Sequence, residues 1–343
     1  MKRVMVVTNS LSGGGAERSM NLISNELTAR GWSIALVPIN SGPPDLVRPN
    51  CQVFPLNREW QGSTINTIKT IWKFNKLVWK LQPDAIVLNC DLPEFFGATL
   101  FSRKKLIAIE HIDRPWSSRI FLGLLVRKVL RARKTTWAAV SGHLTIWPEG
   151  KEPSEILMNS VLPLTIYKES SPPIPKKFGI LRLLFVGRLV PQKRPDWVLE
   201  IAMRSKLPVR FVGDGVMKTS LEGSSRAVSL DADFYGQALD PWGASSPGDL
   251  LVVPSLFEGD GLVVVEGIQH SLPLLLADIP EFRRFNFPDV NYCKDISDFV
   301  ETIDLFREKL PELLIPSQIS ESILATRSSL AIGDSWEKFL DSI

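Results

Sequence analysis

Two glutamates, Glu258 and Glu266, stand eight residues apart in a segment that combines acidic, glycine and apolar positions. An apolar strand expected at Leu250–Val253 leads into this segment. The spacing is a little over two helical turns, so it predicts Glu258 near the start of a helix and Glu266 further along a similar face. Gly259 and Gly261 would let the backbone approach a ligand, and a helix N-terminus attracts phosphate. Carboxylates there suit sugar or ribose hydroxyls, which predicts a nucleotide-sugar pocket.

The alternative for these glutamates is a solvent-facing pair on an amphipathic helix. The apolar neighbours at 262–265 argue against that reading of Glu266, because a buried carboxylate without a partner is costly. We therefore favour a functional role for both carboxylates.

Arg188 and Lys193 form a second candidate group, five residues apart after the strand expected at Leu181–Val186. Across a turn they could converge on one anion and stabilise the charge that develops on a diphosphate leaving group. Two such cations would make a metal ion unnecessary. The alternative is an ordinary solvated basic turn, which is how we interpret Arg194.

A glycine loop at Gly13–Gly15 lies between a strand expected at Val4–Thr8 and a helix expected from about Ala16 to Arg30, and it could cradle phosphate. It departs from the dinucleotide fingerprint because Arg18 occupies the third glycine position, and the strand Ser33–Ile39 is not followed by an acidic residue. Both points argue against a nicotinamide enzyme.

His111 follows a strand expected at Leu106–Glu110, where a side chain could meet a ligand; the alternative is a loop histidine bonded to backbone. The three histidines have no zinc spacing, and neither do the three cysteines, so no metal site is predicted. The cysteines fit buried thiols in a reducing cytoplasm.

Alternating strand and helix patterns predict an α/β fold with two Rossmann-like, doubly wound domains. Further strands are expected at Ala85–Asn89, Thr136–Val140, Val209–Val212, Phe234–Tyr235 and Leu274–Ala277, and a helix at Thr64–Leu81. The domains are expected at 1–170 and 180–325, with a proline-rich linker at 171–179 and a C-terminal helix within 326–343. That helix either caps its own domain or crosses back to the first one.

Four ordered motifs together resemble the retaining glycosyltransferases of the GT-B fold, most closely glycosyltransferase family 4. They are the glycine loop, the basic turn, a strand-end turn and the segment with the two glutamates. In this sequence they are Gly13–Arg18, Phe185–Arg194, Phe211–Gly215 and Val253–Gly267.

The resemblance implies a cleft between the domains, with Gly14 and Gly15 beside the donor phosphate and His111 at the donor sugar. It also implies that Glu266 binds the ribose, that Glu258 contacts the sugar near the reacting carbon, and that the amides of Asp260, Gly261 and Leu262 hold phosphate or sugar oxygens. Three positions depart from the family pattern and leave the donor sugar open: Asp260 between the glycines, Ser271, and the segment Ala277–Glu281.

Charge is unevenly distributed along the chain. Residues 1–170 hold 22 Lys and Arg against 13 Asp and Glu, whereas residues 171–343 hold 18 against 24. A basic first domain favours an anionic membrane surface or a phosphorylated acceptor, and no nucleic-acid motif is present. Two cationic and aromatic segments, at 69–80 and 119–134, suit a membrane interface or an ordinary helix with a charged outer face. No spanning segment or signal peptide is expected.

We therefore expect a metal-independent, retaining hexosyltransferase without a cofactor, located in the cytoplasm, either free or peripheral at the inner face of the cytoplasmic membrane. It would move a sugar from a nucleoside diphosphate, UDP favoured over GDP, to a hydroxyl of a cell-envelope or lipid-linked glycan. The alternatives are another GT-B enzyme, such as a nucleotide-sugar epimerase or a phosphorylase, and a non-catalytic sugar-nucleotide-binding protein.

Overall fold

The chain divides into two compact units. The computed structural model describes residues 2–11, 14–42, 47–59, 63–113, 115–164 and 179–343. Unit 1 comprises Met1–Val161 together with Arg327–Ile343, and unit 2 comprises Leu162–Thr326. Apart from Gly179, the linker expected at 171–179 lies outside the described residues.

Unit 1 is built on a parallel sheet of seven strands in the order β3-β2-β1-β4-β5-β6-β7. The central strands are short apolar runs buried on both faces, as parallel sheets require. The strands are β1 (Arg3–Thr8), β2 (Ser33–Pro38), β3 (Gln52–Val53), β4 (Ala85–Asn89), β5 (Lys105–Glu110), β6 (Thr136–Ala139) and β7 (Glu155–Ile156).

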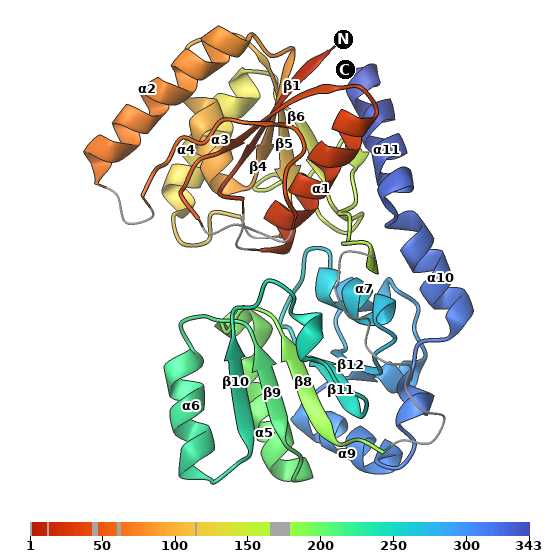
Figure 1. Cartoon of the computed structure of the whole chain (residues 1–343). Coiled ribbons are helices and arrows are strands. Elements are labelled where there is room, and N and C mark those ends of the chain that lie inside the picture. Colours follow the sequence, from red (N-terminus) through yellow and green to blue (C-terminus); the bar gives the residue numbers. More distant parts are fainter. Residues whose placement is uncertain (1, 12–13, 43–46, 60–62, 114, 165–178) are drawn as a thin grey trace. The chain divides into compact units, whose positions relative to one another are not determined.

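Successive residues of β1 enter different hydrophobic clusters, because side chains alternate across a strand. Val4 and Val6 pack with the helices of one face, and Met5 and Val7 with those of the other. The first face is covered by α1 (Gly15–Ala29) and α11 (Ser329–Ser342), and the second by α2 (Thr64–Leu81), α3 (Asp91–Ala98) and α4 (Ile120–Ala132) (Figure 1).

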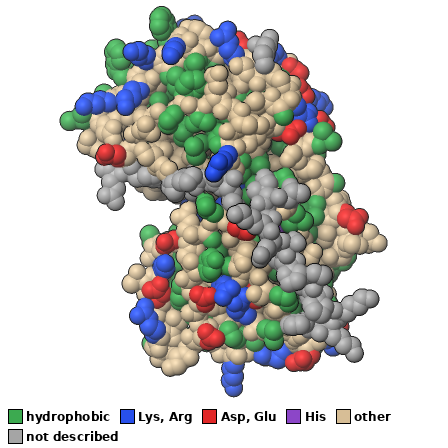
Figure 2. Space-filling view, viewed as in Figure 1, with side chains coloured by type: hydrophobic (Ala, Val, Ile, Leu, Met, Phe, Trp, Pro, Cys, Tyr) green, Lys and Arg blue, Asp and Glu red, His purple; other side chains and the backbone are tan. Residues whose placement is uncertain are grey.

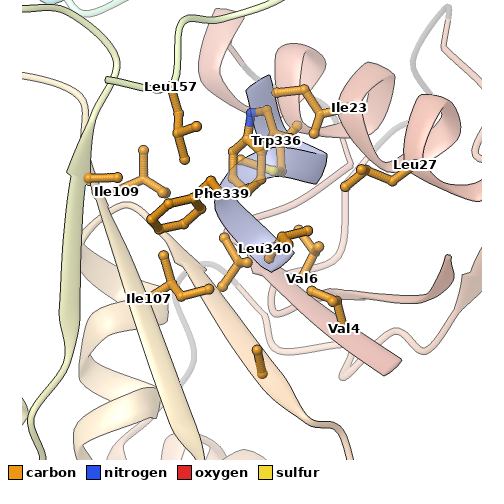
Figure 3. Close-up of a cluster of buried hydrophobic side chains, with 14 of the residues drawn as sticks. Val4, Val6, Ile23, Leu27, Ile107, Ile109, Leu157, Trp336, Phe339 and Leu340 are labelled. Atoms are coloured by element: carbon orange, nitrogen blue, oxygen red, sulfur yellow. The ribbon is translucent and has the colours of Figure 1, made fainter. Parts of the chain in front are cut away.

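Helix α11 is part of the core of unit 1, although it follows unit 2 in the sequence. Trp336, Phe339 and Leu340 are buried against strands β1 and β5 and helix α1 (Figure 3). The side chain of Arg30, at the end of α1, binds Asp334 at 2.6 Å and Glu337 at 3.1 Å. Apolar packing and ion pairs thus hold the C-terminal helix α11 against the N-terminal part of unit 1.

Unit 2 contains six parallel strands in the order β10-β9-β8-β11-β12-β13. The order reverses direction at β8 and β11, which are neighbours in the sheet. Ligands of doubly wound sheets bind at such a reversal, beyond the carboxyl ends of the strands. The strands are β8 (Arg182–Val186), β9 (Val209–Val212), β10 (Ala232–Gly236), β11 (Asp249–Val253), β12 (Leu274–Ala277) and β13 (Tyr292–Cys293).

Helices pack on both faces of this second sheet (Figure 1). One cluster joins strands β8, β9 and β11 to α5, α6 and α9, whereas Gly267 of α7 lies against Leu251 and Leu274. The helices are α5 (Pro195–Ser205), α6 (Lys218–Ala227), α7 (Leu262–Gln269), α8 (Pro280–Arg283), α9 (Ile296–Phe306) and α10 (Ser317–Thr326). Short 3₁₀ turns lie at Pro191–Lys193, Trp242–Ala244, Asp289–Asn291 and Leu310–Leu313.

The turns after β8 and β9 touch backbone to backbone. Gly213 has a φ of +143°, and a Cβ added to it would lie 1.9 Å from the carbonyl oxygen of Gly187. The Gly213 amide donates to the carbonyl of Gly236 at 2.8 Å. Only glycine fits this position, so the turn that carries Arg188 and Lys193 depends on it.

Candidate active site

Glu258 lies in the loop between β11 and α7, and the helix begins four residues later, at Leu262. The expectation that Glu258 and Glu266 share one helix face is therefore wrong. Gly261 adopts the left-handed conformation with a φ of +61°, which ends the loop and allows the helix to begin only at the next residue. Glu258 approaches the site from a turn, and Glu266 from the second turn of α7.

The carboxylate of Glu258 is buried and held by two donors. The Nζ of Lys193 is ion-paired with its Oε1, and the hydroxyl of Ser255 donates to the same oxygen at 2.7 Å. The backbone amide of Glu258 donates to Oε1 of Glu281, which is also buried. Charge-assisted bonds of this kind fix a carboxylate in one orientation. Ser255 and Glu281 were not recognised as site residues from the sequence, although Ser255 directly follows Pro254 at the strand end.

Arg188 takes a different position from Lys193. Its guanidinium is exposed and donates to the side chain of Gln192 at 3.4 Å. Gln192 is bonded in turn to the loop before Glu258. Its side-chain nitrogen Nε2 donates to the backbone carbonyl of Phe257, and its backbone carbonyl accepts from the backbone amide of Leu256. The two cations thus reach the same loop, Lys193 directly and Arg188 through Gln192.

The side chain of Asp260 is engaged in an ion pair with Arg284. Its carboxylate is buried and accepts from Nη2 of Arg284 at 2.9 Å, and the same nitrogen donates to the Asp260 carbonyl at 2.6 Å. The ring of Phe282 packs beneath Gly261. This pair fixes the turn that presents Gly261 and Leu262, and Arg284 is a third residue that was not recognised from the sequence.

Glu266 is half-buried on α7, and its backbone carbonyl accepts from the His270 amide as the helix ends. Leu262, the first residue of the same helix, is also half-buried. The first amides of a helix have no intrahelical acceptor, so they can serve an anionic ligand.

In unit 1 the start of α1 follows the glycine loop. Gly14 is the extended N-cap residue and Gly15 the first helical residue; both are exposed, whereas Gly13 lies outside the described residues. Nearby, the amide of Asn9 donates to Glu17 at 3.0 Å. The backbone at Gly14 and Gly15 is therefore open to approach by a ligand.

His111 lies at the carboxyl end of β5 beside Asn89, which ends β4. The Nε2 of His111 is 2.6 Å from Oδ1 of Asn89. The imidazole is half-buried and Asn89 is fully buried. The side chain of Asn89 thus contacts the ring.

A buried ion cluster lies at the same edge of unit 1. The guanidinium of Arg127 binds Glu94 through two nitrogens, at 2.7 and 3.0 Å, and lies 2.9 Å from Glu110. Trp116 donates to Glu94 at 2.8 Å. Two buried glutamate side chains share one guanidinium, and burial raises the pKa of Glu110 to about 8, so that Glu110 is protonated at neutral pH.

This shift predicts that unit 1 loses stability as pH rises from about 5 to 8. Folded Glu110 keeps its proton up to about pH 8, whereas in the unfolded chain it ionises near its ordinary pKa of 4.5. Its contribution is therefore complete below pH 4.5 and is lost as pH rises through the folded pKa, by up to about 1.4 kcal/mol per pH unit. Urea unfolding monitored by hydrogen exchange of unit 1 would measure this slope. Glu110→Gln should flatten it, and Glu149→Gln, in a partly exposed pair with Arg131, should not. Equal slopes in the wild-type protein and both variants would contradict the assignment.

The segment that carries the two glutamates and the basic turn is similar to a known protein family. Residues 169–311 match the model of the family described as Glycosyl transferases group 1. The similarity to this family thus covers most of unit 2. The match includes Arg188, Lys193, Glu258 and Glu266, and it excludes His111 and the glycine loop.

Among curated proteins, this chain resembles an uncharacterized 41.2 kDa protein in the cps region of Klebsiella pneumoniae. The two are 29% identical over 142 residues, which is 38% of this chain. The chain thus spans 39% of the length of that relative in the alignment.

Solved structures match the chain over its whole length. HepE of Anabaena, crystallised in complex with UDP-glucose, has a TM-score of 0.77 at 15% identity and 100% coverage of both chains. The lipopolysaccharide outer core galactosyltransferase WaaB, in its apo form, has a TM-score of 0.65 at 15% identity, with coverage of 100% of this chain and 99% of its own. The expected GT-B fold is confirmed.

Proposed function

We propose that the protein is a glycosyltransferase that moves a hexose, with retention, from a UDP-sugar to a hydroxyl of a cell-envelope or lipid-linked glycan, without a metal ion. The observation that carries the proposal is the buried carboxylate of Glu258 held by Lys193 and Ser255 at the carboxyl end of β11. The complex of HepE with UDP-glucose supports the donor class, and the resemblance to WaaB and to a protein of a cps region supports the acceptor class.

In this proposal the cations at the end of β8 stabilise the leaving diphosphate. Lys193 is ion-paired with the buried carboxylate of Glu258. Arg188 is exposed and is linked through Gln192 to the loop that carries Glu258. Charge fixed in advance lowers the barrier where negative charge develops. The amides of Asp260, Gly261 and Leu262 bind phosphate or sugar oxygens, and Glu266 accepts from the ribose. In unit 1, Gly14 and Gly15 approach the donor phosphate.

The partners of Glu258 favour same-face attack over a covalent intermediate. An oxygen that already accepts from Lys193 and Ser255 is a poor nucleophile, because both donors stabilise its lone pairs. In the proposed step, the bond between the sugar and the diphosphate oxygen breaks as the acceptor oxygen bonds to the same carbon from the same face. The acceptor proton passes to the leaving phosphate oxygen.

A donor screen tests the proposal directly. We expect a UDP-sugar to raise the melting temperature of the protein, because a ligand that binds only the native state stabilises it. Proton NMR of the product should show the anomeric configuration of the donor, and turnover should persist in EDTA. An inverted product would refute retention, and loss of turnover in EDTA would refute metal independence. Epimerised nucleotide sugar would favour an epimerase, and sugar phosphate would favour a phosphorylase. Binding without turnover would favour a non-catalytic sugar-nucleotide-binding protein.

We further propose that unit 1 binds an anionic membrane surface through α2. Apolar residues along one side of α2 and the lysines beside them are all exposed, whereas Phe74 and Val78 are buried on the opposite side. The apolar members are Ile65, Ile68, Trp72 and Trp79, and the lysines are Lys69, Lys73, Lys76 and Lys80. Figure 2 shows hydrophobic side chains and Lys or Arg side chains interspersed on the part of the surface where Figure 1 places α2.

This composition suits an anionic interface better than water, because exposed tryptophans anchor at the headgroups and lysines attract anionic lipid. Helix α4 adds exposed apolar side chains at Phe121 and Leu125. Among the described residues, none of the helices has the length and apolar character of a membrane span.

The double variant Trp72→Ser, Trp79→Ser should weaken binding to phosphatidylglycerol-containing vesicles by about tenfold or more. Both side chains are exposed, so their loss should leave the fold unchanged. Co-sedimentation would measure this, with phosphatidylcholine vesicles as the neutral surface. Leu305→Ser, which changes an exposed apolar residue of unit 2, is the matched control. If wild-type protein ignores anionic vesicles at physiological salt, the surface has another role.

A further inference from the structure

Asn89 connects the start of α1 to His111. It ends β4, is fully buried, and uses both ends of its amide. Its Nδ2 is 3.5 Å from the carbonyl oxygen of Ala16, in the first turn of α1, and 3.5 Å from the hydroxyl of Thr8. Its Oδ1 is 2.6 Å from Nε2 of His111.

The carbonyl of Ala16 determines which way this amide must face. A carbonyl oxygen can only accept, so the atom of Asn89 that faces it has to be the nitrogen donor. The reverse orientation would bring two acceptor oxygens together with no proton between them. Oδ1 therefore faces His111, and because Oδ1 only accepts, Nε2 of His111 carries a proton.

We propose that Asn89 is a positioning residue that holds His111 as the Nε2–H tautomer, and thereby fixes the ring in the orientation in which it meets the bound sugar. In a neutral imidazole one nitrogen donates and the other accepts, and the bond made by one fixes the role of the other. Only the contact with the sugar rests on the proposed function; the tautomer does not.

The same contacts link His111 to the glycine loop. Asn89 bonds to Ala16, two residues after Gly14, and therefore ties the first turn of α1 to the end of β5. A shift of that turn would move the acceptor of the imidazole. Asn89 thus coordinates two segments to which the family resemblance assigns contact with the donor.

Nitrogen NMR tests the tautomer without any substrate. The chain has only three histidines, so long-range ¹H–¹⁵N spectra of protein labelled at histidine are assigned with His→Gln variants. We expect neutral His111 to show one pyrrole-type nitrogen at Nε2 and one pyridine-type nitrogen at Nδ1. A pyridine-type Nε2 in the wild-type protein would overturn the inference, even if every variant failed to fold.

Asn89→Leu removes the acceptor at similar size and should give a mixture of tautomers, whereas Asn89→Asp keeps an acceptor and should restore the Nε2–H form. Ser141→Ala is the matched control, because Ser141 lies 2.9 Å from Nδ1 of a different ring, His143. It should leave the signals of His111 unchanged. A folded Asn89→Leu with an unchanged His111 tautomer would refute the role.

Kinetics then tests the link to the sugar. Asn89→Leu should lower kcat/KM by about tenfold, a change of about 1.4 kcal/mol in barrier. It should add little to His111→Gln, because both substitutions remove one interaction. If no donor gives turnover, the proposed function fails while the NMR result still decides the tautomer.

Discussion

Lys193→Gln is expected to lower kcat for sugar transfer by about 10²–10³-fold, because removing one fixed donor to developing charge has this effect in other enzymes. Lys193 is the cation that contacts the buried carboxylate of Glu258, and it stands at the switch between β8 and β11. Glu258→Gln should cause a loss of similar size, since the amide keeps the shape but not the charge that Lys193 and Ser255 hold. Steady-state kinetics with the donor found by screening would measure both.

The neighbouring cation supplies the control. Arg194 stacks on the ring of Trp197 with its guanidinium 4.1 Å from the centroid, so Arg194→Gln should retain activity within about threefold. The double variant of Lys193 and Glu258 should be little worse than either single one, because residues that act as a unit are not additive. Wild-type turnover in both single variants would remove the chemical basis of the proposal.

Gly213→Ala is expected to destabilise unit 2 by about 3–5 kcal/mol, one of the largest effects a single methyl group can have. The added carbon would lie 1.9 Å from the Gly187 carbonyl oxygen, and the backbone holds a φ that alanine avoids. The contact is with backbone rather than a flexible side chain, so relief requires the turn before Arg188 to move. Urea unfolding and hydrogen exchange of unit 2 would show the loss.

Gly223 offers the opposite case in the same unit. It lies in α6 with nothing within 4 Å of an added Cβ, so Gly223→Ala should stabilise the helix by about 0.5–1 kcal/mol. If Gly213→Ala changes the free energy of unfolding by less than about 1 kcal/mol, the close approach does not constrain the turn.

The strand pattern was predictable because parallel strands buried on both faces are uninterrupted apolar runs. Ala85–Asn89, Val209–Val212 and Leu274–Ala277 were predicted with the bounds that the structure has. β10 was placed at Phe234–Tyr235 but runs over Ala232–Gly236, because its side chains alternate between exposed and half-buried at the sheet edge. The two-residue strands β3, β7 and β13 carry too few residues for any periodicity.

The candidate site was predictable in its residues but not in its contacts. The sequence identified Lys193 and Glu258, yet their pairing joins positions 65 apart and depends on adjacent strands. Arg284 was not identified, because nothing local marks it as the partner of Asp260. The roles inferred for these residues remain predictions, since motif spacing determines which side chains are near a turn and not which of them bind one another.

The packing of α11 into unit 1 has a consequence for synthesis. The core of unit 1 requires Trp336, Phe339 and Leu340, which leave the ribosome only after all of unit 2. Unit 2 can therefore fold completely before α11 is synthesised. Until then, the apolar side chains of β1 and α1 that pack against α11 remain uncovered. A nascent chain halted anywhere between 162 and 330 would expose that face, so chaperones that recognise exposed hydrophobic segments should bind this intermediate and release it when α11 arrives.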